Sequence, residues 1–217
     1  MRMLVGPVAL LLSACAPAPE ATTADKPVLG LVTTLPLMFA PTFSLEGGSL
    51  LVSALEERYE VRGVAATDAD SLAGIDQLLM AHALPQTAEN LVALDEWVRG
   101  GGEVVLLADP QLEWNVGLPL GHPQAPPYYF GDTGLLAHWG LSLEGPFDGE
   151  EVGGVAVRGA GRLSSNSENC AIEAAGLAAM CSVGEGRAFV IADADFLDAD
   201  PEQANVLIMD ALERLAR

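Results

Sequence analysis

The chain has 217 residues, of which 10 are basic and 30 are acidic, and its formal net charge is −20. Half of the residues are hydrophobic and 18% are charged, so the chain can bury a core and is not generally disordered. The strong acidity, without a basic stripe, argues against nucleic-acid binding, because that binding depends on displacing counterions from phosphates.

The N-terminal residues 1–14 have the pattern of an export signal, with Arg2 ahead of an apolar stretch from Leu4 to Leu12. The sequence LSAC that follows resembles the bacterial lipoprotein box, in which the cysteine, here Cys15, is acylated and becomes the mature N-terminus. We therefore expect attachment to a membrane through lipid. The alternative is an ordinary cleaved signal with an unmodified cysteine. Ala16, in place of an aspartate, slightly favours the outer membrane over the inner one.

Residues 15–27 are rich in Ala, Pro and Thr and have no apolar period, which predicts a flexible tether. The rest of the chain, residues 28–217, is predicted to form a single domain. The first half of this domain alternates strand and helix patterns. We expect strand Val28–Thr33, helix Ser49–Tyr59, strand Tyr59–Ala65, a polar turn over Asp68–Gly74 and strand Gln77–Leu84.

The clearest unit runs from residue 87 to residue 110. Thr87 is the expected N-cap of a helix whose apolar side chains Leu91, Leu94, Trp97 and Val98 recur at helical spacing. Three glycines at 100–102 predict a left-handed termination of this helix. The apolar run Glu103–Leu107 is typical of a strand covered on both faces, and Asp109-Pro110 ends it.

This order predicts an α/β fold with an open, mostly parallel sheet flanked by helices, of the amidotransferase-like or flavodoxin-like kind. Ligands of such folds bind beyond the carboxyl ends of the strands. The proline-rich segment 111–131 starts beside Asp109 and has no period, so it is a candidate lid over those strand ends.

The remaining segments are a short helix and a β-rich excursion, followed by a last strand and helix. We expect a helix over Asp132–Trp139 capped by Asp132. A β-excursion over about 142–186 is expected to contain strands Val152–Arg158, Cys170–Ala174 and Leu177–Val183. Strand Arg187–Ala192 returns to the main sheet, and Asp200-Pro201 starts a helix to about Ala216 that buries Val206, Ile208, Leu212 and Leu215.

Apart from Cys15, the chain has two cysteines, Cys170 and Cys181, on successive predicted strands. Export into an oxidising compartment favours a disulfide between them. Two buried free thiols are the alternative.

Polar side chains gather where strands are predicted to end. Asp109, Asp193 and Asp195 would offer carboxylate oxygens suited to a hard cation. Aspartates also commonly end strands and cap loops in α/β folds, and we expect no bound metal or cofactor. Thr33, Thr34 and His82 lie at the ends of the first and third strands and would add to the same ligand crevice; His82 would approach Asp109.

Familiar catalytic signatures are not found in the sequence. There is no phosphate loop, dinucleotide fingerprint, Cys/His zinc pattern or G-x-S-x-G elbow. The two other histidines, His122 in the proline-rich segment and His138 on the short helix, do not have metal-ligand spacing.

Two segments carry a resemblance to a known family: ALDEWVRGGGEVVLLADP (93–110) and GEGRAFVIADADFLD (184–198). They resemble the soluble domain of the gliding-motility-type (GldG-like) uncharacterised ABC-transport auxiliary family, whose fold is akin to class I glutamine amidotransferases. TTLPL at 33–37 agrees more loosely, and the β-excursion matches poorly.

The resemblance implies a binding role without catalysis. The amidotransferase nucleophile, a cysteine, would follow the strand that ends here in Ala108-Asp109-Pro110, and no cysteine stands there. We therefore expect a non-catalytic, lipid-anchored, periplasm-facing component that works with ABC transporter subunits. The alternatives are a divalent-cation-dependent hydrolase using Asp109, Asp193 and Asp195, with His82 as its base, and a structural envelope lipoprotein.

Overall fold

The computed structural model describes residues 26–38, 49–114, 116–119, 121–122 and 125–217. The signal, most of the tether and Cys15 lie outside these residues. The described residues form one seven-stranded sheet in the order β2-β1-β3-β4-β11-β10-β9. The strands of this sheet are β1 (Val28–Thr33), β2 (Glu60–Gly63), β3 (Gln77–Ala81), β4 (Glu103–Leu107), β9 (Cys170–Glu173), β10 (Ala178–Val183) and β11 (Gly186–Ile191).

The first five strands in this order, from β2 to β11, are parallel, and β10 and β9 continue the sheet antiparallel. The prediction of an open, mostly parallel α/β sheet is confirmed. Every residue of β3 is buried, as are four of the five residues of β4. These strands need apolar side chains on both faces because helices cover both sides of the sheet.

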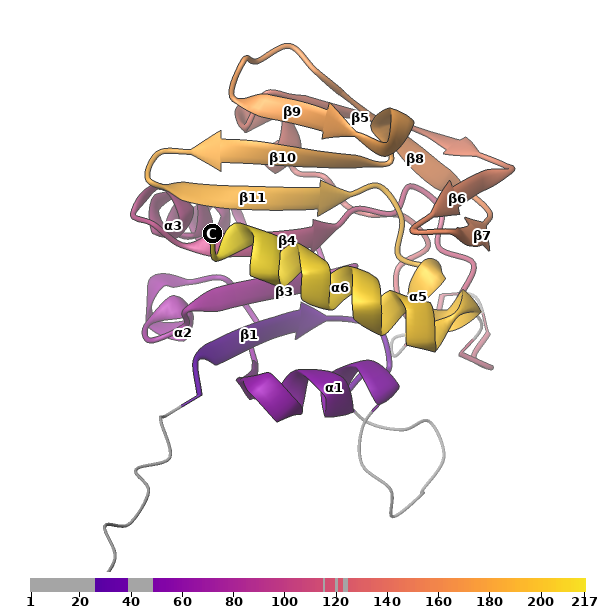
Figure 1. Cartoon of the computed structure of the whole chain (residues 1–217), viewed down its shortest axis with the longest axis horizontal. Helices are drawn as coiled ribbons and strands as arrows, with labels where there is room; N and C mark the ends of the chain where they lie inside the picture. Colours follow the sequence, from indigo (N-terminus) through magenta and orange to yellow (C-terminus); the bar gives the residue numbers. More distant parts are fainter. Residues whose placement is uncertain (1–25, 39–48, 115, 120, 123–124) are drawn as a thin grey trace, which may run out of the picture.

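Helices form a layer on each face of the sheet. They are α1 (Leu50–Arg58), α2 (Ala69–Leu72), α3 (Ala88–Arg99), α4 (Leu135–His138), α5 (Phe196–Ala199) and α6 (Pro201–Leu215). One core cluster contains buried side chains of α1, α5 and α6, and the other contains those of α2, α3 and α4. Figure 1 shows α6 lying across the near face beside α1, with α3 behind the sheet.

The segment expected to be a separate β-excursion is divided between two places. Strands β9 and β10 belong to the main sheet, because β10 pairs along its length with β11. The pair β5 (Leu141–Phe147) and β8 (Ala160–Ser165) forms a small sheet, and β6 (Glu150–Val152) and β7 (Val155–Val157) form another. The predicted strand over residues 152–158 is therefore wrong: a turn at Gly153-Gly154 breaks it into parts of two strands.

Several expected boundaries also change. Asp68–Gly74 is not only a turn, because Asp68 caps the short helix α2 by accepting a hydrogen bond from the Ser71 amide. The helix expected over 132–139 is shortened to α4, and Gly134 is its N-cap. Asp132 Oδ1 nevertheless accepts hydrogen bonds from the Gly134 amide, at 3.0 Å, and from the Leu136 amide in the first turn of α4, at 3.4 Å, so the expected capping contact is present.

The glycine turn after α3 uses its three glycines differently. Gly101 has a φ of +108° and supplies the left-handed conformation, whereas Gly100 has a φ of −81°. A Cβ on Gly102 would lie 2.5 Å from the Trp97 ring, so this glycine permits close packing. The expected burial of α6 is wrong at Val206, which is 62% exposed, and right at the three other apolar positions, Ile208, Leu212 and Leu215.

A disulfide joins Cys170 to Cys181, as predicted, and connects β9 to β10 with a Cα–Cα distance of 4.0 Å. Within the described residues, no helix has the length and apolar character needed to cross a membrane.

Candidate functional site

The candidate site lies at the carboxyl edge of the sheet, where β4 and β11 run side by side and end together. Asp109 follows β4 by two residues and Asp193 follows β11 by two residues. Asp195 precedes the first residue of α5. One oxygen from each carboxylate can be chosen so that all three lie within 4.8 Å of one another. The three aspartates therefore lie close together at the ends of the strands, as expected from the sequence.

Asp109 ties the end of β4 to two neighbouring segments. Its Oδ1 accepts a hydrogen bond of 2.8 Å from the Gln111 amide, and its Oδ2 accepts one of 3.0 Å from the Ala194 amide. Its backbone carbonyl accepts from the Phe130 amide at 2.8 Å. Asp109 therefore holds both stems of the 111–131 segment and the chain that leaves β11.

Asp195 and Asp193 are held by backbone amides as well. Both oxygens of Asp195 accept from the Glu113 amide, at 3.0 and 2.9 Å. Asp193 Oδ1 accepts from the Phe196 amide at 3.0 Å, whereas its Oδ2 is buried and has no hydrogen-bond partner within the described ranges. The carboxylates thus connect β4, β11 and the start of the proline-rich segment.

Burial dominates the electrostatics of these three groups, because a charged carboxylate loses its hydration there. It raises the pKa of Asp109 to about 6 against the lowering effect of the backbone amides. It raises the pKa of Asp193 to about 8, with a further contribution from the negative charge of Asp109. Burial, followed by the charges of Asp109 and Glu113, raises the pKa of Asp195 to about 7.

His82 and the two threonines form a separate group. Thr33 Oγ1 donates to the Ala81 carbonyl at 2.9 Å, and Thr34 Oγ1 donates to the His82 carbonyl at 2.6 Å. His82 is fully buried, and its Nε2 lies 2.7 Å from the Pro127 carbonyl oxygen, while no described residue provides a hydrogen-bond partner for Nδ1. His82 therefore holds the proline-rich segment, and among the described residues no hydrogen bond joins its ring to Asp109. Burial lowers the pKa of His82.

The backbone of His82 is unusual, since its φ is +48°, in the left-handed region that non-glycine residues seldom adopt. Such a conformation persists where surrounding contacts fix the residue, and here His82 is held by its amide on the Leu107 carbonyl and its ring on the Pro127 carbonyl. Of the remaining histidines, His138 lies on the surface and contacts Asp95 and Arg99. In the part of the chain that the structure describes, it makes no hydrogen bond to the three aspartates of the candidate site.

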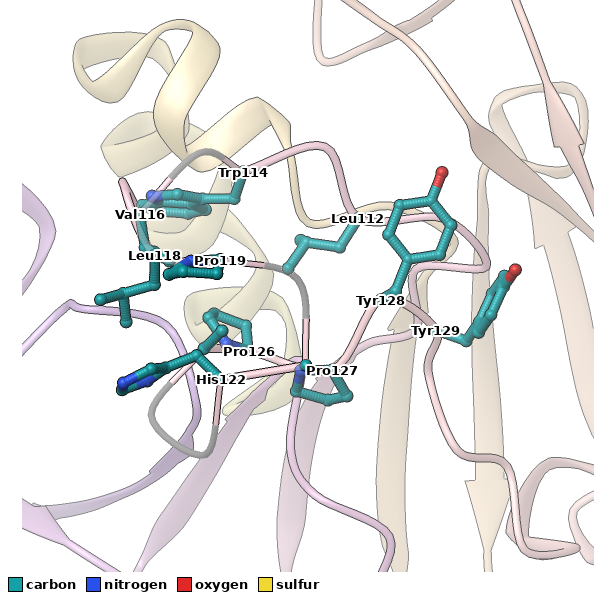
Figure 2. A pocket seen from close by; sticks show the side chains of 12 residues that line it. Leu112, Trp114, Val116, Leu118, Pro119, His122, Pro126, Pro127, Tyr128 and Tyr129 are labelled. Atoms are coloured by element: carbon teal, nitrogen blue, oxygen red, sulfur yellow. The ribbon is translucent and has the colours of Figure 1, made fainter.

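An open pocket of about 780 Å³ lies in the proline-rich segment itself. Most of its described lining is apolar or aromatic: Leu112, Trp114, Val116, Leu118, Pro119, Gly121, His122, Ala125, Pro126, Pro127, Tyr128 and Tyr129. Figure 2 shows the Trp114 and proline rings arranged around this space, with the Leu112 side chain extending into it and the tyrosine hydroxyls pointing away. None of the three aspartates, the two threonines or His82 lines this pocket.

The pocket residues could not be recognised as a site from the sequence. Loop side chains follow no period, and only the proline content of 111–131 and its position beside Asp109 marked the segment. The stems of the loop are fixed: the Leu112 amide donates to the Tyr128 carbonyl at 3.0 Å, and Asp109, Asp195 and His82 hold the chain on either side. The pocket is therefore built on the ends of the strands.

Comparisons with known proteins show the fold alone. No family model and no curated protein matches the sequence. Among solved structures, the IFT52 N-terminal domain has a TM-score of 0.56 and 12% identity, over 87% of this chain and 96% of that domain. A cytoplasmic protein of Salmonella typhimurium LT2 has a TM-score of 0.43 and 14% identity, over 85% of this chain and 99% of that protein.

A third similarity is to an exo-β-1,4-mannosidase from Opitutaceae bacterium strain TAV5. The TM-score is 0.49 and the identity is 11%, over 88% of this chain. The chain spans 36% of the length of that enzyme. The IFT52 similarity supports the α/β fold, and at these identities none of the three identifies an activity.

Proposed function

We propose that this protein is a non-catalytic binding component of an ABC-type transport system, held by lipid on Cys15 at the extracytoplasmic side of a bacterial membrane. We further assign its sheet to the class I glutamine amidotransferase-like folds, as the resemblance of residues 93–110 and 184–198 implies. One observation carries the binding role: the open pocket is lined mainly by apolar and aromatic side chains, which suits association with an apolar surface of a partner.

The polar groups beside the pocket support a role without catalysis. Asp109 and Asp195 accept hydrogen bonds from backbone amides through all four of their carboxylate oxygens. His82 uses Nε2 to hold the Pro127 carbonyl. A general base must reach the proton that it removes. These side chains hold the loop, and none of them lines the open pocket.

The second candidate is a divalent-cation-dependent hydrolase, which the convergence of Asp109, Asp193 and Asp195 favours. Such an enzyme needs its ion in contact with substrate. The burial of Asp109 and Asp193, which are 0% exposed, supports this candidate less well than it supports a structural role for the aspartates.

Site-specific photocrosslinking in intact cells tests the binding role. A photoreactive side chain placed at Tyr129, which lines the pocket and is 62% exposed, should form adducts with a transporter subunit. The same group at Val206, also 62% exposed but on α6, is the matched control and should give none. Recovery of the protein and its adducts in the membrane fraction tests the anchor.

Two results would count against the proposal. Equal adducts from both positions would show that the pocket has no special role. Adducts at position 129 with proteins unrelated to transport, identified by mass spectrometry, would remove the transporter assignment.

A further inference from the structure

The three aspartates at the carboxyl edge are buried carboxyl groups without a basic side chain beside them among the described residues. Asp109 and Asp193 are 0% exposed, and Asp195 is 8% exposed. Among the ion pairs of the described residues, no lysine or arginine contacts any of the three. Buried charges in proteins are normally paired or coordinate a metal, because their desolvation is costly.

Among the residues that the structure describes, one oxygen of the cluster has no hydrogen-bond partner. Backbone amides donate one hydrogen bond to each oxygen of Asp109, to each oxygen of Asp195 and to Asp193 Oδ1. Asp193 Oδ2 is buried and receives none. A buried acceptor without a partner is uncommon, since it loses its water without compensation. This oxygen belongs to a carboxylate that lies close to the other two, and a cation bound among the three would supply the partner that the described residues do not.

We infer that Asp109, Asp193 and Asp195 bind a calcium ion, with Asp193 Oδ2 as a ligand. Carboxylate oxygens are ligands for hard cations, and calcium accepts irregular shells with oxygens at about 2.3–2.6 Å. Oxygens bound to calcium are thus up to about 4.6–5.2 Å apart, which is compatible with three oxygens within 4.8 Å of one another. Magnesium requires a regular octahedron at about 2.0–2.1 Å and gives up its waters reluctantly, so a buried and irregular site suits it less well. Water can complete the shell from the partly exposed side, at Asp195.

The ion would join three segments that the backbone amides already bring together. Asp109 follows β4, Asp193 follows β11, and Asp195 holds the Glu113 amide at the start of the pocket loop. Calcium would therefore fasten the base of the loop to the sheet. This inference is independent of which partner or ligand occupies the pocket.

Calcium binding to the purified chain tests the site. After treatment with a chelator and its removal, calorimetry with calcium chloride should give saturable heat close to one ion per chain. The melting temperature should rise by about 5–10 °C at a calcium concentration a hundredfold above the dissociation constant. Asp193→Asn retains an acceptor for the Phe196 amide but removes the charge, so it should fold and lose both responses.

Asp198→Asn is the matched control. It removes the same charge five residues further along the chain, at an exposed position of α5 that is outside the cluster. This variant should keep the calcium response of the unmodified chain. Absence of heat and of a thermal shift at millimolar calcium would overturn the site. A full response in folded Asp193→Asn would do so as well, and an equal shift with magnesium would overturn the choice of calcium.

Discussion

At the scale of single residues, Asp193 is the most informative side chain. In the unfolded chain its carboxyl has a pKa near 3.8, and burial raises the pKa to about 8 in the folded protein. Without a cation, the folded state thus retains a proton that the unfolded state releases. The resulting stability is fully present below the unfolded pKa and is lost as the pH rises through the folded pKa.

Asp193→Asn should therefore change the pH dependence of stability in the presence of a chelator. Between about pH 5 and pH 8, the unmodified chain should lose up to about 1.4 kcal/mol per pH unit relative to the variant, which corresponds to one proton. Urea unfolding at a series of pH values measures this difference. The contribution of His82 is common to both proteins, whereas Asp109 and Asp195 interact with Asp193 and titrate together with it. Parallel curves would show that Asp193 ionises normally in the folded state.

A second prediction at this scale concerns the stability effect of adding a side chain at Gly186. A Cβ at this position would lie 2.1 Å from the Val98 carbonyl oxygen and 2.2 Å from that of Gly102. Backbone atoms cannot move aside as a flexible side chain can, so Gly186→Ala should cost about 2–3 kcal/mol of unfolding free energy. Chemical denaturation measures the change.

Gly100→Ala is the control for this substitution. Its φ is −81° and its Cβ would be 3.4 Å from the nearest atom, the Glu96 carbonyl oxygen. The change in stability should be within about 0.5 kcal/mol. Similar losses in the two variants would contradict the steric explanation.

At the scale of elements, the disulfide ties the edge strand β9 to β10. Cys170 and Cys181 face each other across the antiparallel pair and are 11 residues apart in the sequence. The bridge restricts the unfolded chain, so the double substitution Cys170→Ala and Cys181→Ala should lower stability by about 2–3 kcal/mol. Denaturant unfolding with and without a reducing agent measures this.

The reducing agent provides the internal control for the disulfide. It should destabilise the unmodified chain and leave the double variant unchanged. If reduction affects both proteins alike, the loss arises from something other than the bridge.

The agreement between the predicted and observed bounds differs from one helix or strand to another. Strand β4 was predicted with its observed bounds because glycines precede its apolar run and Asp109-Pro110 follows it closely. Helix α6 was predicted because Asp200 and Pro201 are strong start signals, and Asp200 does accept from the Gln203 amide. Strands β5 and β8 were missed because their exposed, polar and glycine positions weaken the apolar alternation.

At the scale of the whole molecule, the sequence predicted that Asp109, Asp193 and Asp195 lie close together, but it did not predict the pocket. Parallel strands bring their carboxyl ends to one edge, so Asp109 and Asp193 had to lie near one another once β4 and β11 were neighbours. The pocket depends on hydrogen bonds between residues far apart in the sequence. Asp195 accepts from the Glu113 amide, and the His82 ring contacts the Pro127 carbonyl. No periodic pattern records such contacts, because loops are positioned by individual hydrogen bonds.

The two ends of the domain leave the sheet at the edge opposite to the pocket. Val28 opens β1 at the amino edge, and helix α6 returns there, since its Leu212 carbonyl accepts from the side chain of Gln77, the first residue of β3 (Figure 1). Strands of this length span about 17–20 Å. A purification tag or a sensor-chip linker at the C-terminus, after α6, should therefore leave the pocket facing free solution, and the immobilised chain can be used directly to screen for what it captures.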